Sequence, residues 1–268
     1  MAEKADMAQI EIDGSPADAA RVAALGLLNY GHFTTLRVEA GRVRGLALHM
    51  ERLVRDCRAL FAAELDPAKV RERIRAVLPA DGAPVIVRVT VYDPELGLER
   101  PSGPAVPRVL VTTRPAPAAA PGPLRVRTVA YVRETPEVKH VGLFGLIRHR
   151  RSAQLDGYDD ALLTDPAGRV TEGATWNTGF FDGRRLVWPE GPSLPGVTAA
   201  LLAGAYGGAQ GREPVDATGL GRFEAAFAVN AGVGVRPVAA VDGFRFDPAH
   251  PVLAELRAAY EEVATDLV

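Results

Sequence analysis

Two residue types that carry special chemistry are scarce in this chain of 268 residues. Lysine occurs only at Lys4, Lys69 and Lys139, although lysine and arginine together number 31, so arginine supplies the general positive charge. Cys57 is the only cysteine, which excludes an intrachain disulfide and a metal site built from cysteines. No apolar run approaches the ~20 residues that a bilayer-spanning helix needs, so we expect no membrane segment.

Several binding functions are also disfavoured by what is missing. The net charge of −2 gives no concentrated basic face for nucleic acid, and the short basic stretch 148–151 is either a solvated helix face or a phosphate-binding patch. The five histidines lack metal-ligand spacing, so we expect no metal site. Residues 1–9 mix acidic and basic side chains without an apolar stretch, which argues against export and for a cytoplasmic protein.

The hydrophobic pattern predicts intermixed strands and helices. The predicted strands cover residues 9–13, 33–40, 85–92, 108–113, 124–132, 161–164, 178–181 and 225–229. The predicted helices cover residues 48–61, 67–78, 143–155, 198–207 and 252–263. Because strands and helices do not alternate strictly, a doubly wound parallel sheet is not expected.

A proline-rich segment divides the chain. Residues 114–123 are too dense in proline for regular structure and favour an extended tether. We therefore predict a small α/β domain over residues 1–114, a linker over 115–123 and a second domain over 124–268. A chain of this length has room for two ordinary cores.

Lys139 is unusual because the chain otherwise uses arginine for positive charge. It lies between apolar residues in the sequence Glu137-Val138-Lys139-His140-Val141. A lysine can lose its proton and attack a carbonyl, which an arginine cannot do. Lys139 is therefore either a lysine at a strand edge whose stem covers apolar surface or a residue with a chemical role.

Three further stretches accompany Lys139. They are Gly157-Tyr-Asp-Asp-Ala-Leu-Leu-Thr-Asp-Pro-Ala-Gly-Arg-Val-Thr-Glu172, Ser193-Leu-Pro-Gly-Val-Thr198, and His49-Met-Glu-Arg52-Leu53. Together they resemble the class IV aminotransferase family, the pyridoxal phosphate enzymes of fold type IV, over nearly the whole chain. The resemblance implies an α/β fold with a two-layer N-terminal domain and a barrel-like C-terminal domain. It also implies a homodimer that acts on a small-molecule amine or amino acid.

The resemblance implies roles for individual residues in binding pyridoxal 5'-phosphate. Lys139 matches the family's lysine that binds the cofactor covalently, and Glu172 matches the glutamate beside the pyridine nitrogen. Arg52 matches the phosphate arginine, while Val197 and Thr198 match the phosphate-binding start of a helix. Asn230 occupies the place of a second phosphate-side loop.

Two stretches resemble one branch of the family, the 4-amino-4-deoxychorismate lyases. They are Gly31-His-Phe-Thr-Thr-Leu-Arg-Val-Glu-Ala-Gly-Arg-Val43 and His49-Met-Glu-Arg-Leu-Val-Arg-Asp-Cys-Arg-Ala-Leu60. We expect Phe33 and Arg37 on the substrate side, with Arg37 contacting a carboxylate. A branched-chain or D-amino acid type aminotransferase is the alternative, and a non-catalytic binding relic is a second one. These alternatives stay open because residues 91–93, 142, 177–179 and 199–200 depart from the family pattern.

Overall fold

The computed structural model describes residues 10–118 and 121–268, which form two compact units. The first unit holds the described residues up to Pro117, together with Val138–Gly142 and Ala264–Val268. The second unit holds the described residues of Ala118–Glu137 and Leu143–Val263. Within the described ranges, no helix is long and apolar enough to cross a membrane.

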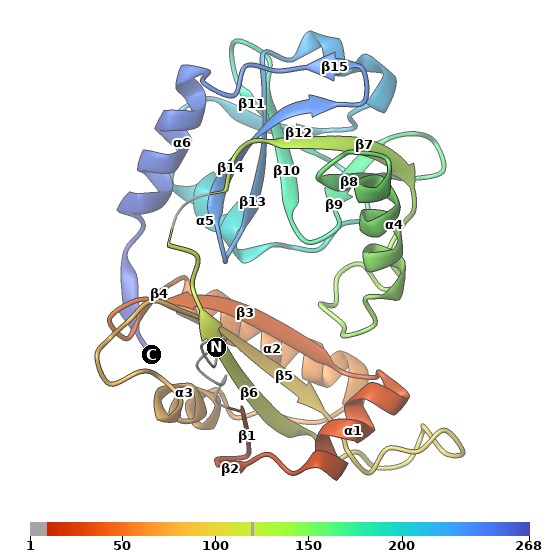
Figure 1. Ribbon diagram of the computed structural model, residues 1–268, viewed down its shortest axis with the longest axis vertical. Coiled ribbons are helices and arrows are strands. Elements are labelled where there is room, and N and C mark those ends of the chain that lie inside the picture. Colours follow the sequence, from red (N-terminus) through yellow and green to blue (C-terminus); the bar gives the residue numbers. More distant parts are fainter. Residues whose placement is uncertain (1–9, 119–120) are drawn as a thin grey trace, which may run out of the picture. The chain divides into compact units, whose positions relative to one another are not determined.

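The first unit is built on a five-stranded antiparallel sheet with the strand order β2-β1-β6-β5-β3 (Figure 1). Its strands are β1 (Ile10–Ile12), β2 (Ser15–Pro16), β3 (His32–Val38), β5 (Val85–Tyr92) and β6 (Arg108–Pro115). A separate two-stranded sheet pairs β4 (Arg42–Arg44) with β16 (Thr265–Leu267). The chain turns from β3 to β4 at Ala40 and Gly41, which both have positive φ, so the strand predicted over 33–40 ends at Val38.

Helices α2 (Leu46–Phe61) and α3 (Pro67–Ala76) cover one face of this sheet, and α1 (Ala19–Leu28) follows β2. The apolar side chains of α2 recur at helical spacing, and Leu53 and Cys57 pack in one core with Leu36 and Val89 of the strands. The predicted start of α3 is confirmed, because the Asp66 side chain accepts a hydrogen bond from the first turn. The helix α1 was not predicted, and it has no fully buried residue.

The second unit is built on a nine-stranded mixed sheet. Its order is β12-β11-β10-β13-β14-β7-β8-β9, with β15 paired to β14. The strands are β7 (Leu124–Ala130), β8 (Asp160–Thr164), β9 (Val170–Gly173), β10 (Asn177–Phe181), β11 (Leu186–Pro189), β12 (Gln210–Glu213), β13 (Ala225–Asn230), β14 (Gly234–Val241) and β15 (Phe244–Arg245). Strand β9 also lies close to β10 and β11, so the sheet curls into a half-barrel, which confirms the barrel-like prediction.

Three helices pack on the second unit's sheet, and each coincides within a few residues with a predicted helix. They are α4 (Phe144–Leu155), α5 (Val197–Ala205) and α6 (Pro251–Glu262). Helices α5 and α6 share one core with β11, β13 and β14, whereas α4 packs on β7 and β8 (Figure 1). A short 3₁₀ helix spans Ala217–Arg222. The mixed α/β class predicted from the sequence is confirmed.

Candidate active site

Lys139 lies in the segment Val138–Gly142, which belongs to the first unit. The N–H of Phe33 on β3 donates to the carbonyl of Lys139 over 2.9 Å. The N–H of Lys139 donates to Oδ2 of Asp56 on α2 over 3.0 Å, and the Asp56 side chain is fully buried. The backbone of the lysine is therefore fixed to both a strand and a helix.

The Lys139 amine lies beside an aromatic ring. Its Nζ is 4.9 Å from the centroid of the Phe33 ring, and the guanidinium carbon of Arg88 on β5 is 3.7 Å from the same centroid. The π face of a phenyl ring attracts cations at such distances. Phe33 thus lies next to Lys139, and its place on the substrate side stays a prediction. Arg88 is a neighbour that no sequence motif indicated.

Arg52 is buried on the helix-covered side of the sheet. Its Nη2 donates to the Thr34 hydroxyl and lies 3.2 Å from Nδ1 of His49. The Thr34 Oγ1 is 2.7 Å from the same ring nitrogen. Because the hydroxyl accepts from Arg52, it donates to His49, whose neutral ring then carries its proton on Nε2.

Two buried histidines lie beside these cations. Burial lowers the pKa of His49 well below its usual value, and the charges of Arg52 and Lys139 lower it further. Burial also lowers the pKa of His32 from 6.5 to about 3, with smaller effects from Arg52 and Arg55. Neither ring nitrogen of His32 has a hydrogen-bond partner among the described residues. Both rings are therefore neutral at neutral pH.

We expect this pair to make the folded state acid-sensitive. Below a pH of about 6.5 the unfolded chain takes up protons on both histidines, whereas folded His32 does so only near pH 3. The free energy of unfolding should therefore fall as the pH drops, by up to about 1.4 kcal/mol per pH unit for each histidine. Urea unfolding at pH 7.5, 6.5 and 5.5 measures this slope.

His32→Leu is the informative variant, because it removes one of the two histidines. Its pH slope should be smaller than that of the parent protein, because a histidine whose folded-state pKa is lowered has been removed. His250→Gln is the matched control, since the parent's slope should persist when a partly exposed histidine outside this pair is replaced. An unchanged slope in His32→Leu would show that His32 is not the group responsible.

Glu172 is buried on β9 in the second unit. Its Oε2 accepts a hydrogen bond of 3.3 Å from the N–H of Leu194, and its Oε1 lies 3.6 Å from Nη1 of Arg133. The Arg133 side chain is also buried and donates to the carbonyl of Pro136 over 3.3 Å. The carboxylate of Glu172 is therefore held between the backbone amide of Leu194 and the guanidinium of Arg133. No sequence motif indicated Arg133 or Leu194 as neighbours of Glu172.

Val197 and Thr198 are the first two residues of α5, and both are buried. The residue before them, Gly196, is the N-cap, and no side chain of the described residues caps the first turn. The amide of Asn177 donates to the carbonyl of Leu194 over 2.9 Å, and its oxygen fills the space that a Cβ at position 196 would need. Leu194 thus joins Glu172 and Asn177 through its two backbone groups and positions the start of α5.

Asn230 ends β13 and shapes the turn that follows it. Its Oδ1 accepts hydrogen bonds of 3.0 Å from the N–H groups of both Gly232 and Val233. Its amide lies 3.5 Å from the carbonyl of Thr175. These contacts give Asn230 a local structural role beside its predicted one, which stays a prediction.

Arg37 lies at a distance from the lysine. It shares the face of β3 that carries Phe33, but four residues of a strand span about 13 Å. Its Nε is 4.0 Å from a carboxylate oxygen of Glu39, and the side chain is about one-third exposed. The first unit therefore groups Lys139, Phe33 and Arg88, with Arg37 further along the sheet.

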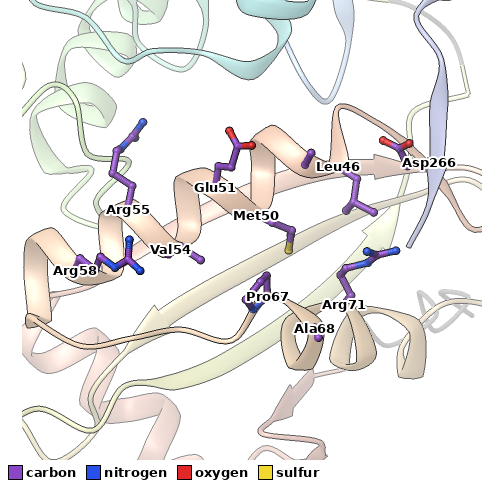
Figure 2. A pocket seen from close by; sticks show the side chains of 11 residues that line it. Leu46, Met50, Glu51, Val54, Arg55, Arg58, Pro67, Ala68, Arg71 and Asp266 are labelled. Carbon is purple, nitrogen blue, oxygen red and sulfur yellow. The ribbon is translucent and has the colours of Figure 1, made fainter.

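The first unit also has a groove of about 800 Å³ between α2 and α3 (Figure 2). Met50 of α2 points toward Pro67 at the start of α3, and Arg71 and Asp266 lie at one end. None of the predicted site residues lines this groove. The groove is therefore distinct from the surroundings of Lys139.

The comparison with protein families decides the classification. The family described as "Amino-transferase class IV" matches residues 31–241. This chain belongs to the class IV aminotransferase family. The matched range includes Arg52, Lys139, Glu172, Thr198 and Asn230, and it confirms the family predicted from the motifs.

Solved structures share the fold of this class IV family member. An aminotransferase from Brucella abortus bound to pyridoxal phosphate is 20% identical, with a TM-score of 0.84 and coverage of 95% of this chain and 98% of that chain. A branched-chain aminotransferase from Thermoproteus uzoniensis with norvaline is 22% identical, with a TM-score of 0.80 and coverage of 94% and 93%. A putative 4-amino-4-deoxychorismate lyase from Legionella pneumophila is 21% identical, with a TM-score of 0.78 and coverage of 90% and 93%. At these identities the likeness shows the fold alone, and the comparison with curated proteins gives no match.

Proposed function

We propose that this protein is a pyridoxal phosphate-dependent lyase of the 4-amino-4-deoxychorismate type, which releases pyruvate and leaves p-aminobenzoate. The observation that carries the proposal is that both lyase-like stretches contact Lys139. In the stretch 31–43, the backbone N–H of Phe33 donates a hydrogen bond to the carbonyl of Lys139, and the Phe33 ring lies beside the Lys139 amine. In the stretch 49–60, the side chain of Asp56 accepts a hydrogen bond from the backbone N–H of Lys139.

The residues present fit pyridoxal phosphate, which is the cofactor named for the Brucella abortus structure. The first unit supplies an amine at Lys139 and a buried guanidinium at Arg52. The second unit supplies the buried carboxylate of Glu172 and, at Val197 and Thr198, a helix start whose first turn no described side chain caps. Amine, cation, carboxylate and helix N-terminus are the donor and charge types that this cofactor requires.

Each of these residues would have one task. When bound, pyridoxal phosphate would weaken the bond between the substrate's amine-bearing carbon and its hydrogen by drawing electrons away from it. Lys139 would hold the cofactor covalently until the substrate's amine displaces it, and its freed Nζ would then accept that proton. Glu172 would keep the pyridine nitrogen protonated, while Arg52 and the first amides of α5 would bind the phosphate.

An aminotransferase is the second candidate. It is favoured by the family match and by branched-chain aminotransferases that share the fold at TM-scores of 0.80 and above. The same residues would serve both reactions up to the removal of the proton. The two reactions differ in their later steps, because only the aminotransferase needs a second keto acid. The predicted homodimer, the cytoplasmic location and the domain boundaries near residues 115–123 remain part of this proposal.

A single incubation separates the two reactions. The purified protein is loaded with pyridoxal phosphate and given 4-amino-4-deoxychorismate without any keto acid. The lyase should give equal amounts of pyruvate, measured with lactate dehydrogenase, and p-aminobenzoate, measured by chromatography. No pyruvate, together with conversion of an L- or D-amino acid that depends on added 2-oxoglutarate, would replace the lyase by an aminotransferase.

A further inference from the structure

The face of the first unit's sheet that α2 and α3 leave uncovered carries a distinct set of side chains. Thr34 and Leu36 of β3 contact α2, so Phe33 and Thr35 point to the opposite face. In the register of the sheet, Thr35 pairs with Arg88 and Phe33 pairs with Thr90. Arg88 therefore shares the face of Phe33, on a strand that has neighbours on both sides.

Arg88 is held in place on this face. Its guanidinium carbon lies 3.7 Å from the centroid of the Phe33 ring, and its Nε donates to the Thr90 hydroxyl over 3.2 Å. The side chain is partly buried, and burial lowers its pKa. Stacking on an aromatic ring orients the plane of the guanidinium and leaves the N–H groups at its edge to bind a ligand.

No carboxylate lies within ion-pair distance of Arg88 in the described part of the chain. By comparison, Arg37 lies 4.0 Å from an oxygen of Glu39, Arg21 lies 3.3 Å from an oxygen of Asp18, and Arg58 lies 2.7 Å from an oxygen of Glu64. Taking a cation out of water costs free energy unless an anion or several hydrogen bonds compensate it. A partly buried arginine with one hydrogen bond and a ring contact is therefore suited to an anion from outside the chain.

The position of Arg88 relative to Lys139 specifies that anion. Both cations contact the ring of Phe33, and the two distances to its centroid place Nζ and the guanidinium carbon less than about 9 Å apart. A small molecule whose amine reacts at Lys139 can thus bring a second group to Arg88. The planar fork of a guanidinium matches the two oxygens of a carboxylate.

We infer that Arg88 binds the carboxylate of the substrate whose amine reacts at Lys139. Arg88, rather than Arg37, is then the residue that restricts the substrates to amines that also carry a carboxylate. This inference rests on the proposed function for the role of Lys139, but carboxylate binding at Arg88 does not depend on turnover.

Binding of benzoate and benzamide to the full chain loaded with pyridoxal phosphate tests the inference. The two probes share a ring and differ in charge, so calorimetric titration isolates the contribution of the carboxylate. The parent protein should bind benzoate more tightly than benzamide. Arg88→Gln should weaken the binding of benzoate roughly 10- to 100-fold, because it removes a charge-assisted pair between the guanidinium and the carboxylate. The same substitution should change the affinity for benzamide less than about twofold.

Three further variants sharpen the result. Arg88→Lys keeps the charge without the fork and should lose part of the affinity for benzoate. Arg114→Gln is the matched control, since Arg114 is an exposed arginine on β6 of the same sheet, and it should bind both probes like the parent. The inference is wrong if Arg37→Gln, and not Arg88→Gln, weakens the binding of benzoate. It is also wrong if the parent protein binds benzoate no more tightly than benzamide.

Turnover then separates this inference from the proposed function. In an active enzyme, Arg88→Gln should raise KM at least about tenfold with a smaller change in kcat. The proposed function alone would be refuted by a protein that shows no turnover but binds benzoate more tightly than benzamide and loses this difference in Arg88→Gln. A lyase or aminotransferase whose KM and benzoate affinity are unchanged in Arg88→Gln would refute the inference alone.

Discussion

Replacing Lys139 by alanine is expected to reduce turnover by at least roughly 10²–10⁴-fold while the protein stays folded. The variant lacks the amine that would bind the cofactor and accept the substrate's proton. It keeps the backbone groups that bond to Phe33 and Asp56, and these fix the segment. Steady-state kinetics and circular dichroism measure the two parts of this prediction.

The variant Lys139→Arg separates the need for a reactive amine at position 139 from the need for a positive charge there. Lys139→Arg keeps a cation beside the Phe33 ring but cannot supply a neutral amine, so it should be as inactive as the alanine variant. Lys69→Ala is the matched control, because Lys69 is exposed on α3 and should not affect turnover.

Borohydride reduction of the loaded protein adds a direct readout. The pyridoxyl label should appear on the peptide that contains Lys139 in the parent and in Lys69→Ala, and on no peptide in Lys139→Arg. Turnover in Lys139→Arg within tenfold of the parent, or a label on another peptide, would contradict the proposed role of Lys139.

Most elements with a clear hydrophobic period could be predicted from the sequence. The helix α2 has apolar residues at every third or fourth position, and the valine-rich β5 has the composition of a strand. The helix α1 was missed because it buries no face completely, so burial imposes no helical period on its sequence. Strands β9, β11 and β12 have four residues each, which is too short for a period to be recognised.

The candidate site was predictable only where a motif names the residue. Lys139 and Glu172 come from the resemblance, but Asp56, which holds the backbone of Lys139, is 83 residues away from it in the sequence. Arg133 and the backbone of Leu194 meet Glu172 through the fold of the second unit. Arg88 lies within a predicted strand, but its position beside Phe33 depends on the register between β3 and β5, which no local pattern specifies.

Replacing Glu172 by glutamine is expected to lower kcat by roughly 10²–10³-fold without preventing covalent binding of the cofactor. Glutamine keeps an oxygen that can accept from the N–H of Leu194, but it cannot hold a proton on the pyridine nitrogen by charge. The borohydride label on Lys139 should therefore persist while proton removal slows. Glu190→Gln is the matched control, because Glu190 is an exposed glutamate of the same unit.

A second variant separates this chemical role from the structural role of the Glu172–Arg133 pair. Removing one partner of a buried ion pair costs about 3–5 kcal/mol, whereas replacing both partners by uncharged groups is often neutral. Glu172→Gln should therefore lower the urea midpoint, and the double variant with Arg133→Met should recover part of it. If kcat recovers together with stability in the double variant, Glu172 acts through folding. If kcat stays low in a protein of near-parental stability, the carboxylate itself is required for the reaction.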